Sequence, residues 1–537
     1  MESSPQPGRP AATPLGRTIH SVGRGATAMA VATLCLLAFQ FLARVLVTRS
    51  VSVTEWGEFS LALALTSLVA LLAAFGIPTA VARSLAFEPT YEERTRVVRR
   101  ATLFSIGVAA ASTILLYVFA GGIAAGFHDA NLTGVLQLFA LTIPFSILSS
   151  VLAGFFQGME RAEPNAIFNQ IVNPGLFLVF AWLLLFYGWH FTGAVLGYVL
   201  SYAFSFAALA VYSALRLPAV LRASSTETFT GDVSGRIPLV ELAVTLFGIS
   251  TLSYVTSFGD TLVLGVFRST QIVGQYSSAM TLARLFLVGS GAITYIYLPV
   301  SARLRREGDY ATVRQSYVTS SRWLVLITLP LFFLFTFDPA NTLGVTFGKL
   351  YVSAAPTLQV LAVGSFIAVM VGPAASCLGG IGRPRAMLLF TLSSAVANVA
   401  LSFTLIPLFG LAGAAYAWSV ARVLYPVLCL AFLWSEYGIH PFAAHYLKPL
   451  ALSVVVLLPI FYLSSSLRVW WMLPILFVAV VLVYLGSILA TRSVDPGDVI
   501  VLRGVERRLG FRLPRLIRLF ESREIRVAPV SVPAPGG

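Results

Sequence analysis

Charged residues are scarce in this chain, and cysteine is almost absent. Only 11% of the 537 residues are charged and 57% are hydrophobic, with a mean hydropathy of +0.85, whereas soluble domains are about a quarter charged. This composition excludes a soluble enzyme of the same length. The three cysteines, Cys35, Cys377 and Cys429, lie inside apolar runs, so the sequence offers neither a disulfide framework nor a CxxC zinc site.

Motifs for catalysis and nucleotide binding are also missing. The five histidines show no HExxH or other metal-ligand spacing, and no Walker, GxSxG or Ser-His-Asp pattern occurs in a suitable context. Between the apolar runs, the longest connection covers about 216–236, which is too short to fold around its own core. The sequence therefore predicts no catalytic domain, no cofactor and no metal site, and we expect a protein that is not an enzyme.

Long apolar runs dominate what is present. A membrane-spanning helix needs about 20 predominantly apolar residues, and a window of about 19 residues finds fourteen such runs. They cover residues 26–48, 57–82, 101–125, 134–157, 166–187, 191–215, 237–266, 274–300, 318–337, 353–378, 386–409, 411–434, 447–466 and 470–491. We therefore predict an all-α integral membrane protein with about fourteen transmembrane helices.

The positions of the cations predict how the chain is oriented. When the connections are numbered alternately and Lys448, at the very start of its span, is counted with the preceding loop, both termini and the even-numbered loops hold 28 of the 36 Lys and Arg, and the opposite loops hold four. Cytoplasmic loops carry the excess of Lys and Arg in membrane proteins. Both termini are thus expected in the cytoplasm, which agrees with an even number of spans. The net charge of +14 reflects this topology, and we expect no nucleic-acid partner.

The first half of the chain is repeated in the second at an offset near 220 residues. Residues 55–60, Glu-Trp-Gly-Glu-Phe-Ser, align with residues 272–277, Ile-Val-Gly-Gln-Tyr-Ser, and each segment opens an even-numbered span. Three further matches follow in the same order: Pro78 and 82–83 with Pro299 and 302–303, 157–161 with 379–383, and Gly188 and Gly193 with Gly410 and Gly413. Such an order indicates two six-helix halves of the same orientation, as transporters often have.

The runs, the loops and the repeat together predict the organisation of the chain. It comprises a cytoplasmic N-terminal segment at 1–25, a first six-helix bundle at 26–215, a cytoplasmic linker at 216–236, a second six-helix bundle at 237–434, two additional transmembrane helices at 447–491 and a basic cytoplasmic tail at 492–537.

Several of these segments resemble a known family. They are Gly-Glu-Phe-Ser at 57–60, the Gln-Gly-x-x-Arg turn at 157–161, Gly-Arg-Pro at 382–384, Asn398, and the stretch Leu-Ile-Pro-Leu-Phe-Gly-Leu-Ala-Gly-Ala-Ala at 405–415. From about residue 20 to 490, the chain is similar to the polysaccharide and oligosaccharide flippases of the multidrug/oligosaccharidyl-lipid/polysaccharide (MOP) exporter superfamily.

The resemblance implies a function in the cell (plasma) membrane. Such a protein carries an oligosaccharide linked to polyprenyl phosphate or pyrophosphate from the cytoplasmic to the outer leaflet by alternating access, for assembly of surface polysaccharide or glycoprotein. The implied partners are the polyprenyl-linked oligosaccharide, membrane lipids, and glycosyltransferases or a polymerase of the same pathway.

Charged residues inside the predicted spans are the candidates for substrate contact. Arg284 and Arg422 are expected near the bilayer midplane, whereas Arg44 and Asp260 lie nearer the outside. Because a charge inside a bilayer costs at least about 2.5–3.5 kcal/mol, it usually faces a watery cavity or a partner. A guanidinium can hold a phosphate through two hydrogen bonds. We therefore predict that the three arginines bind the phosphorylated head of the substrate in a central cavity between the two halves.

Other residues in or near the spans have less specific interpretations. Asp260 is expected either to form an ion pair with Arg44 or Arg284 or to act as a coupling acid. Glu241, near the cytoplasmic end of a span, is expected to be solvated, and Arg322 is interpreted as an interfacial charge that opens the ninth span. Five aromatic residues either stack on sugar rings or pack within the bundle: Tyr254, Tyr276, Tyr295, Tyr297 and Trp418.

Three alternatives to an oligosaccharide flippase remain open. A lipid II flippase would share the fourteen spans and the cavity arginines. A cation-coupled multidrug antiporter of the same superfamily would have twelve spans and several buried acids, which this sequence does not show. A membrane-embedded glycan ligase or polymerase would carry a large external loop, whereas the longest outward connection here covers about 338–352.

Overall fold

The computed structural model describes residues 14–87, 90–224, 239–287, 307–442, 444–464 and 471–494, together with Tyr297, residues 301–303 and Arg305. Within these residues every secondary-structure element is a helix, as predicted. In chain order they are α1 (Pro14–Ser50), α2 (Val53–Ala74), α3 (Ile77–Phe87), α4 (Tyr91–Gly126), α5 (Leu132–Ala140), α6 (Thr142–Gly158), the π-helix η1 (Asn165–Val172), α7 (Asn173–Phe186), α8 (His190–Ser224), α9 (Leu239–Phe267), α10 (Thr270–Ala283), α12 (Tyr310–Phe337), α13 (Pro339–Thr346), the 3-10 helix η3 (Lys349–Ala354), α14 (Ala355–Met370), α15 (Ala374–Ile381), α16 (Pro384–Phe409), α17 (Leu411–Tyr437), α18 (Ala444–Ser464) and α19 (Met472–Ala490).

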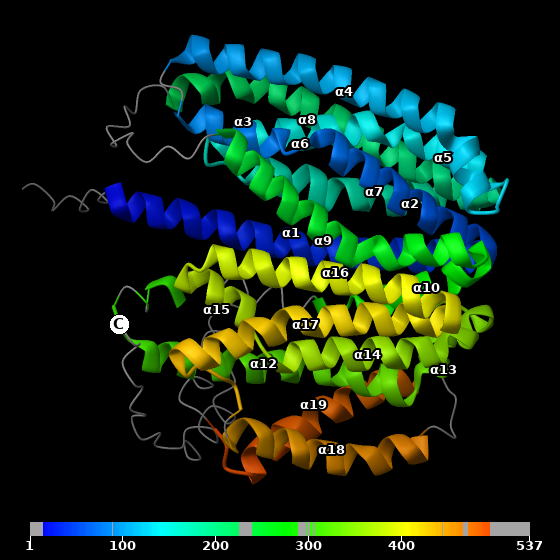
Figure 1. Cartoon of the computed structure of the whole chain (residues 1–537), viewed down its shortest axis with the longest axis vertical. Coiled ribbons are helices and arrows are strands. Elements are labelled where there is room, and N and C mark those ends of the chain that lie inside the picture. Colours follow the sequence, from blue (N-terminus) through cyan, green and yellow to red (C-terminus); the bar gives the residue numbers. More distant parts are fainter. Residues whose placement is uncertain are drawn as a thin grey trace, which may run out of the picture.

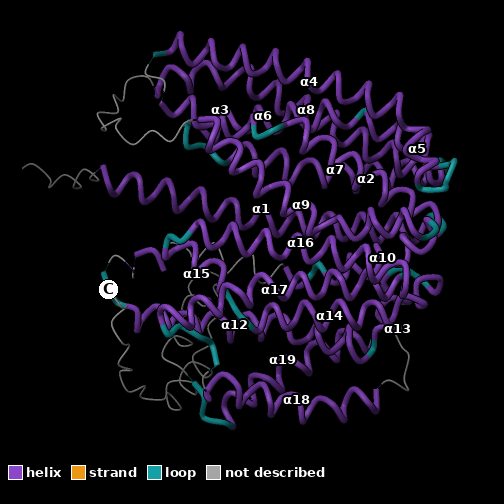
Figure 2. The backbone as a smooth tube through the Cα atoms, viewed as in Figure 1, coloured by secondary structure: helices purple, strands orange, loops and turns teal. Residues whose placement is uncertain are grey.

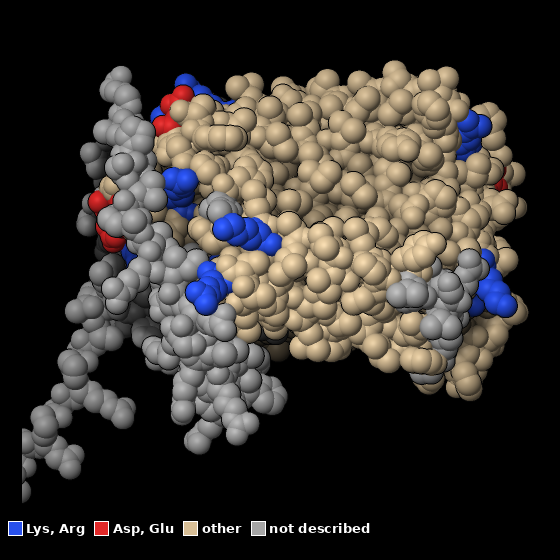
Figure 3. Space-filling view, turned by 90° about the horizontal axis from the view of Figure 1, so that it is seen from below, with Lys and Arg blue, Asp and Glu red and all other residues tan. Residues whose placement is uncertain are grey.

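Twelve helical segments of the described chain are long and apolar enough to cross a membrane. They correspond to twelve of the fourteen predicted spans, and the spans at 237–266 and 274–300 are not among them. The first of these is α9, which is interrupted by Ser, Thr and Asp residues, and the second falls largely outside the described residues. The total of fourteen therefore stays a prediction. On the face drawn in Figure 3, charged side chains lie toward the two ends of the molecule and leave a broad uncharged band between them.

The helices form two bundles that lie side by side (Figure 1). Helices α2 to α8 make up one bundle, and α10 together with α12 to α17 makes up the other, with α18 and α19 along its far edge. Between them lie α1, which packs on α7 and η1, and α9, which packs on α16 and also reaches α2. The start of α1 and the end of α19 lie at the same end of the molecule, as an even number of crossings requires (Figure 2).

Several predicted spans are not single helices. The span at 57–82 divides into α2 and α3 because Phe75 and Gly76 adopt positive φ values of 37° and 71°, a conformation that ends a helix. The span at 353–378 divides before Pro373, which lacks the N–H that a continuous helix would use. Helix α10 ends at Ala283, and Arg284 is its C-cap. The break therefore places a cation at a helix end within the bundle.

The ends of the predicted domains also differ from the helix ends. Helix α1 begins at Pro14, within the segment expected to be an N-terminal extension, and α8 continues to Ser224, within the expected linker. Most of the predicted basic tail, from residue 495 onward, lies outside the described residues, as do residues 225–238.

Glycines matched by the sequence repeat make matched contacts. A Cβ on Gly158 would lie 2.4 Å from the carbonyl oxygen of Ala82, and one on Gly380 would lie 2.0 Å from the Ser301 hydroxyl oxygen and 3.1 Å from the backbone nitrogen of Ala302. Ala82 and Ala302 are themselves matched in the repeat. Close backbone approach at small residues is characteristic of helix packing in membranes, and it occurs at equivalent positions in both halves.

Arg322 is buried, which shows that its interpretation as an interfacial charge is wrong. Its side chain is only 2% exposed. Helix α12 begins at Tyr310 and continues through the polar segment that was expected to precede the ninth span. Arg322 therefore lies well inside the helix and packs within the bundle instead of opening a span.

Candidate functional site

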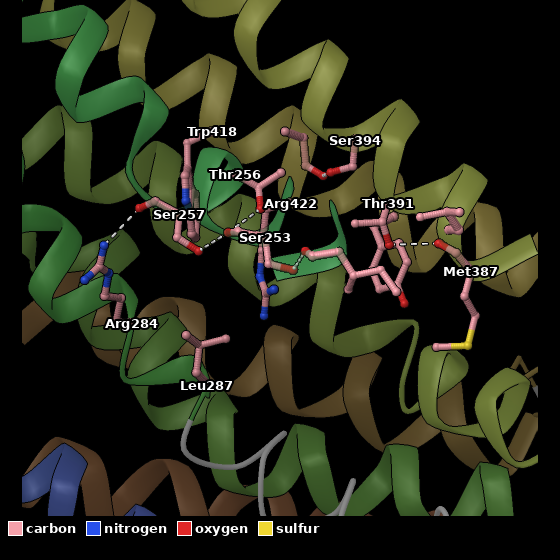
Figure 4. Close-up of a pocket in the computed structure, with 14 residues that line it drawn as sticks. Ser253, Thr256, Ser257, Arg284, Leu287, Met387, Thr391, Ser394, Trp418 and Arg422 are labelled. Atoms are coloured by element: carbon pink, nitrogen blue, oxygen red, sulfur yellow. Dashed lines mark hydrogen bonds between the residues drawn. The ribbon is translucent and has the colours of Figure 1, made fainter. Parts of the chain in front are cut away.

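The main candidate site is a cavity of about 410 Å³ between α9 and the second bundle (Figure 4). Its walls come from α9, α16, α17 and the segment that follows α10. The lining residues are Ile249, Ser253, Thr256, Ser257, Arg284, Leu287, Met387, Leu388, Thr391, Ser394, Trp418, Ala421, Arg422 and Tyr425. We predicted a cavity between the two halves, but these walls belong to the second half alone. Its volume is in the range usual for ligand pockets.

Arg284 is held in place on the wall of this cavity. Its Nη2 donates a 3.0 Å hydrogen bond to the carbonyl oxygen of Ser257, and its guanidinium carbon lies 4.6 Å from the centre of the Phe258 ring. The carbonyl oxygen and the face of the aromatic ring both attract a cation. These contacts fix the orientation of the guanidinium and leave its other N–H groups available to a ligand.

Arg422 projects from α17 into the same cavity (Figure 4). Within the described part of the chain, its guanidinium has no hydrogen-bond or ion-pair partner. Pro426, one turn later, has no N–H to donate to the Arg422 carbonyl, an arrangement that bends helices. The cavity therefore contains a cation whose hydrogen-bonding capacity the described side chains do not use.

Arg44 belongs to a second, smaller cavity between the halves. This space of about 30 Å³ is lined by Arg44, Trp56 and Ser60 from the first half, and by Arg284 and Thr281 from the second. Arg44 Nη1 donates a 3.3 Å hydrogen bond to the Thr281 hydroxyl. Because Arg284 lines both cavities, the structure brings together the three arginines that the sequence singled out.

The serine and threonine hydroxyl groups of the larger cavity donate their protons to backbone carbonyls, which leaves their oxygens as acceptors for a ligand. Ser253 and Ser257 donate to carbonyl oxygens one turn earlier in α9, at 2.8 and 2.7 Å. Thr391 donates to the Met387 carbonyl and Ser394 to the Ala421 carbonyl, both at 2.8 Å. None of the described residues that line the cavity is Asp or Glu. The cavity thus combines guanidinium donors for an anion with hydroxyl oxygens that can accept from a polyol.

Asp260 lies apart from this cavity. Its side chain is 0% exposed, and the hydroxyl of Tyr276 donates a hydrogen bond to its Oδ2. Its Oδ1 has no hydrogen-bond partner among the described residues, and none of their arginines lies within 4 Å of this carboxylate. The Asp260 carboxyl therefore links α9 to α10 through a hydrogen bond from a tyrosine. It does not form the expected ion pair with any arginine of the described chain.

Of the proposed sugar-stacking aromatics that the structure describes, only one lines the arginine cavity. Trp418 does so, whereas Tyr276 is buried against Asp260, Tyr297 donates to the Val313 carbonyl and Tyr254 donates to the Ala64 carbonyl. Tyr295 and the side chain of Glu241 lie outside the described residues. Packing therefore explains the described tyrosines of this set.

The sequence interpretation missed the hydroxyl-bearing wall. Ser253, Thr256 and Ser257 recur at helical spacing in α9, and this polar stripe within a membrane helix could have identified them. Thr391 and Ser394 on α16 follow the same spacing, but neither stripe could be assigned to the arginines before the packing of α9, α16 and α17 was known.

The fold and the sequence both have known relatives. A protein of Shigella flexneri named as an O-antigen transporter is 23% identical over 390 residues, which cover 71% of this chain and 90% of the relative. A Haloferax volcanii protein named as the low-salt glycan biosynthesis flippase Agl15 is 25% identical over 208 residues, 37% of this chain and 43% of the relative.

Solved structures of two transporter types share the fold. The lipid II flippase MurJ in an inward closed conformation superposes with a TM-score of 0.66 at 14% identity, over 85% of this chain and 97% of that one. An inward-facing multidrug resistance MATE transporter of the MOP superfamily gives 0.60 at 13% identity, over 75% and 97%. The family described as polysaccharide biosynthesis protein matches residues 22–305, more than half of the sequence, and the chain therefore belongs to this family.

Proposed function

We propose that this protein is a flippase that moves an oligosaccharide linked to polyprenyl phosphate or pyrophosphate from the cytoplasmic to the outer leaflet by alternating access. The observation that carries the proposal is the cavity system of Arg44, Arg284 and Arg422, which no described Asp or Glu lines. The names of the Shigella and Haloferax relatives support a lipid-linked glycan as substrate.

The phosphate and the sugar of the substrate head group would bind different residues of the cavity. Its phosphate would bind Arg284 and Arg422, whose guanidinium groups suit a doubly hydrogen-bonded oxyanion. Sugar hydroxyls would donate to the oxygens of Ser253, Ser257 and Thr391, whose own protons are committed to backbone carbonyls. Trp418 offers an apolar face to a sugar ring.

The contact that Arg44 makes between the two halves would depend on their relative position. It extends from α1 to Thr281 on α10, so that rocking of one half against the other would break this contact and reposition its charge. In this proposal the substrate phosphate is bound first by the second half and then meets Arg44 as the halves move.

The alternatives fit the cavity less well. A pocket for cationic drugs would be expected to carry carboxylates, whereas the charged residues that line this one are arginines. Lipid II also carries a polyprenyl pyrophosphate and shares the anionic chemistry, and the likeness to MurJ concerns the fold. The relatives named as O-antigen and glycan transporters therefore favour an oligosaccharide.

The proposal includes the membrane arrangement predicted from the sequence. It has fourteen spans, both termini in the cytoplasm and a location in the cell membrane, where glycosyltransferases would supply the substrate and a polymerase or ligase would consume it. Asp260, buried with one oxygen free of hydrogen-bond partners among the described residues, is the proposed coupling acid.

The test is mass spectrometry of lipid extracts from a strain that lacks the protein, rescued by the wild type, by Arg284→Ala or by Arg216→Ala. Arg216 is an exposed residue of α8 away from both cavities and serves as the matched control. A polyprenyl-linked oligosaccharide should accumulate in the deletion strain and be cleared by the wild type and Arg216→Ala only. Unchanged carrier lipids would exclude the proposed substrate, and full clearance by Arg284→Ala would exclude the proposed site.

A further inference from the structure

A second elongated cavity lies in the first bundle, away from the arginines. It encloses about 380 Å³ between α4 and α8, with α6 as its floor. Tyr91 and Leu221 line one end, and Ile106 and Phe206 line the other. At 1.5 Å per residue, the stretch of α4 from Tyr91 to Ile106 is about 22 Å long, more than the thickness of one leaflet of a hydrocarbon core about 30 Å across.

The walls of this groove offer few hydrogen-bonding groups to a ligand. Most lining residues are apolar. Of the four lining hydroxyl groups, that of Tyr91 lies at one end of the groove, and the other three already donate their protons to backbone carbonyls. Thr95, Thr102 and Ser213 donate to the carbonyls of Tyr91, Val98 and Leu209 at 2.8, 2.8 and 2.7 Å. Along most of this length, burial of a polar group would cost free energy with little compensation. A hydrocarbon chain is therefore the occupant that these walls suit best.

Two arginines lie at one end of the groove, the end that Tyr91 and Leu221 line. The guanidinium carbon of Arg222 lies 5.2 Å from the centre of the Tyr91 ring. Arg94 is only 5% exposed, and its Nη1 donates a 3.4 Å hydrogen bond to the carbonyl oxygen of Leu221. At the start of the same helix α4, the Glu93 carboxylate accepts a 2.7 Å hydrogen bond from the Thr90 hydroxyl. The positive charge of this end is thus held in place next to the apolar groove.

We propose that the groove between α4 and α8 binds one acyl chain of an anionic phospholipid whose phosphate lies against Arg222 and Arg94. Basic pockets between transmembrane helices are suited to anionic lipid head groups, and the apolar walls account for the chain. The lipid would fill the space that α4 and α8 leave open and so tie these two helices together.

The isoprenoid tail of a transported substrate is a less suitable occupant. The arginine cavity is lined by α9, α16 and α17, whereas α4 and α8 lie at the outer edge of the other bundle (Figure 1). A tail in the groove would leave its phosphate at Arg222 and Arg94, far from the arginine cavity. The groove is therefore assigned to a bound membrane lipid.

The test is native mass spectrometry of the purified full-length protein titrated with phosphatidylglycerol or with phosphatidylcholine of the same chains. The wild type should bind phosphatidylglycerol more tightly. Arg222→Gln should weaken phosphatidylglycerol binding about fivefold, the effect of one interfacial cation, and should leave phosphatidylcholine binding unchanged. The matched control Arg216→Gln, on the same helix and away from the groove, should behave as the wild type.

A second pair of variants tests the chain-binding part. Ala210→Trp should fill the groove and reduce binding of both lipids, whereas Ala208→Trp, on an exposed part of α8 that does not line the groove, should reduce neither. Equal phosphatidylglycerol binding by wild type, Arg222→Gln and Ala210→Trp would overturn the proposal. Displacement of phosphatidylglycerol by an equimolar polyprenyl phosphate, abolished by Arg222→Gln, would also overturn it and assign the groove to the substrate tail.

Discussion

Gly57 and Gly274 occupy matched positions in the two repeats, and they lie against one another where α2 crosses α10. A Cβ on Gly57 would lie 1.8 Å from the carbonyl oxygen of Thr270, and one on Gly274 would lie 2.0 Å from that of Val53. Thr270 and Val53 each precede the glycine of their own helix by one turn. The contact is therefore reciprocal, and it joins the two halves at a point of local pseudo-twofold symmetry.

This crossing predicts that alanine is not tolerated at either glycine. Gly57→Ala and Gly274→Ala should each destabilise the protein by about 1–3 kcal/mol, because the added methyl group forces two backbones apart. Thermal unfolding in detergent measures the effect. The control is Gly122→Ala in α4, where a Cβ would meet nothing within 4 Å and where alanine favours the helix. Unfolding temperatures that are the same for all three variants would contradict the close approach.

The cavity cations predict graded effects at Arg422. Arg422→Ala should lower transport of a labelled polyprenyl-linked oligosaccharide by about tenfold or more, since a hydrogen bond to a charged group contributes about 1.5–3 kcal/mol. Arg422→Lys should retain part of the activity, because lysine keeps the charge and loses the fork geometry. Initial rates in proteoliposomes distinguish the three proteins. A lysine variant as inactive as the alanine variant would mean that charge alone does not bind the substrate.

The Asp260–Tyr276 hydrogen bond predicts a difference between two conservative variants. Tyr276→Phe removes the donor and leaves a buried carboxyl without this partner, at a cost of about 1–3 kcal/mol. Asp260→Asn keeps an acceptor for the tyrosine hydroxyl and should cost less. Chemical denaturation of both variants measures this order. If Asp260 is the coupling acid, the folded Asn variant should in addition lose the response of transport to an imposed ion gradient, which a purely structural role would not affect.

His440 predicts a pH dependence at the loop after α17. Burial, and then the neighbouring Arg314, lower the pKa of His440, and Arg314 Nη2 lies 3.1 Å from its Nε2. The folded protein therefore binds fewer protons at this site than the unfolded chain as the pH falls below the ordinary value of 6.5. Its contribution to stability is intact above that pH and declines below it, until the folded state is protonated too.

Hydrogen exchange of residues 438–440 at pH 7.5 and pH 5.5 measures this effect. Exchange should be faster at the lower pH, because an imidazolium beside Arg314 repels it and cannot accept its hydrogen bond. His440→Gln keeps a neutral acceptor and should show the same exchange at both pH values, apart from the intrinsic change. An equally large acceleration in this variant would place the titrating group elsewhere.

Some features of the site could be predicted residue by residue. Arg44, Arg284 and Arg422 stand out because a charge in an apolar run is costly and needs a reason, and the three do line adjoining cavities. The glycines of the repeat were recognisable because a close backbone approach admits no side chain, and Gly57 and Gly274 are now seen in contact.

Other features depended on contacts between helices far apart in sequence. From the sequence, Arg322 is interpreted as interfacial because it stands near the start of the apolar run. The helix α12 begins earlier, at Tyr310, and only the packing of the bundle shows that the Arg322 side chain is buried. The hydrogen-bond partner of Asp260 is Tyr276 on a neighbouring helix. The spacing of residues along the chain cannot predict whether this carboxyl pairs with a tyrosine or with an arginine. The hydroxyls of α9 and α16 acquired a role only when both helices were placed beside α17.

The sequence by itself determined that this chain is an all-helical membrane protein of the polysaccharide biosynthesis family, because hydropathy, charge placement and repeated glycines are local properties of the chain. The tertiary structure decided that the arginine cavity lies between α9 and the second bundle, with Arg44 contacting the adjoining smaller cavity from the first half. It also decided that a separate apolar groove lies between α4 and α8. Cavities arise from the way helices distant in sequence pack against one another, and no local pattern records that packing.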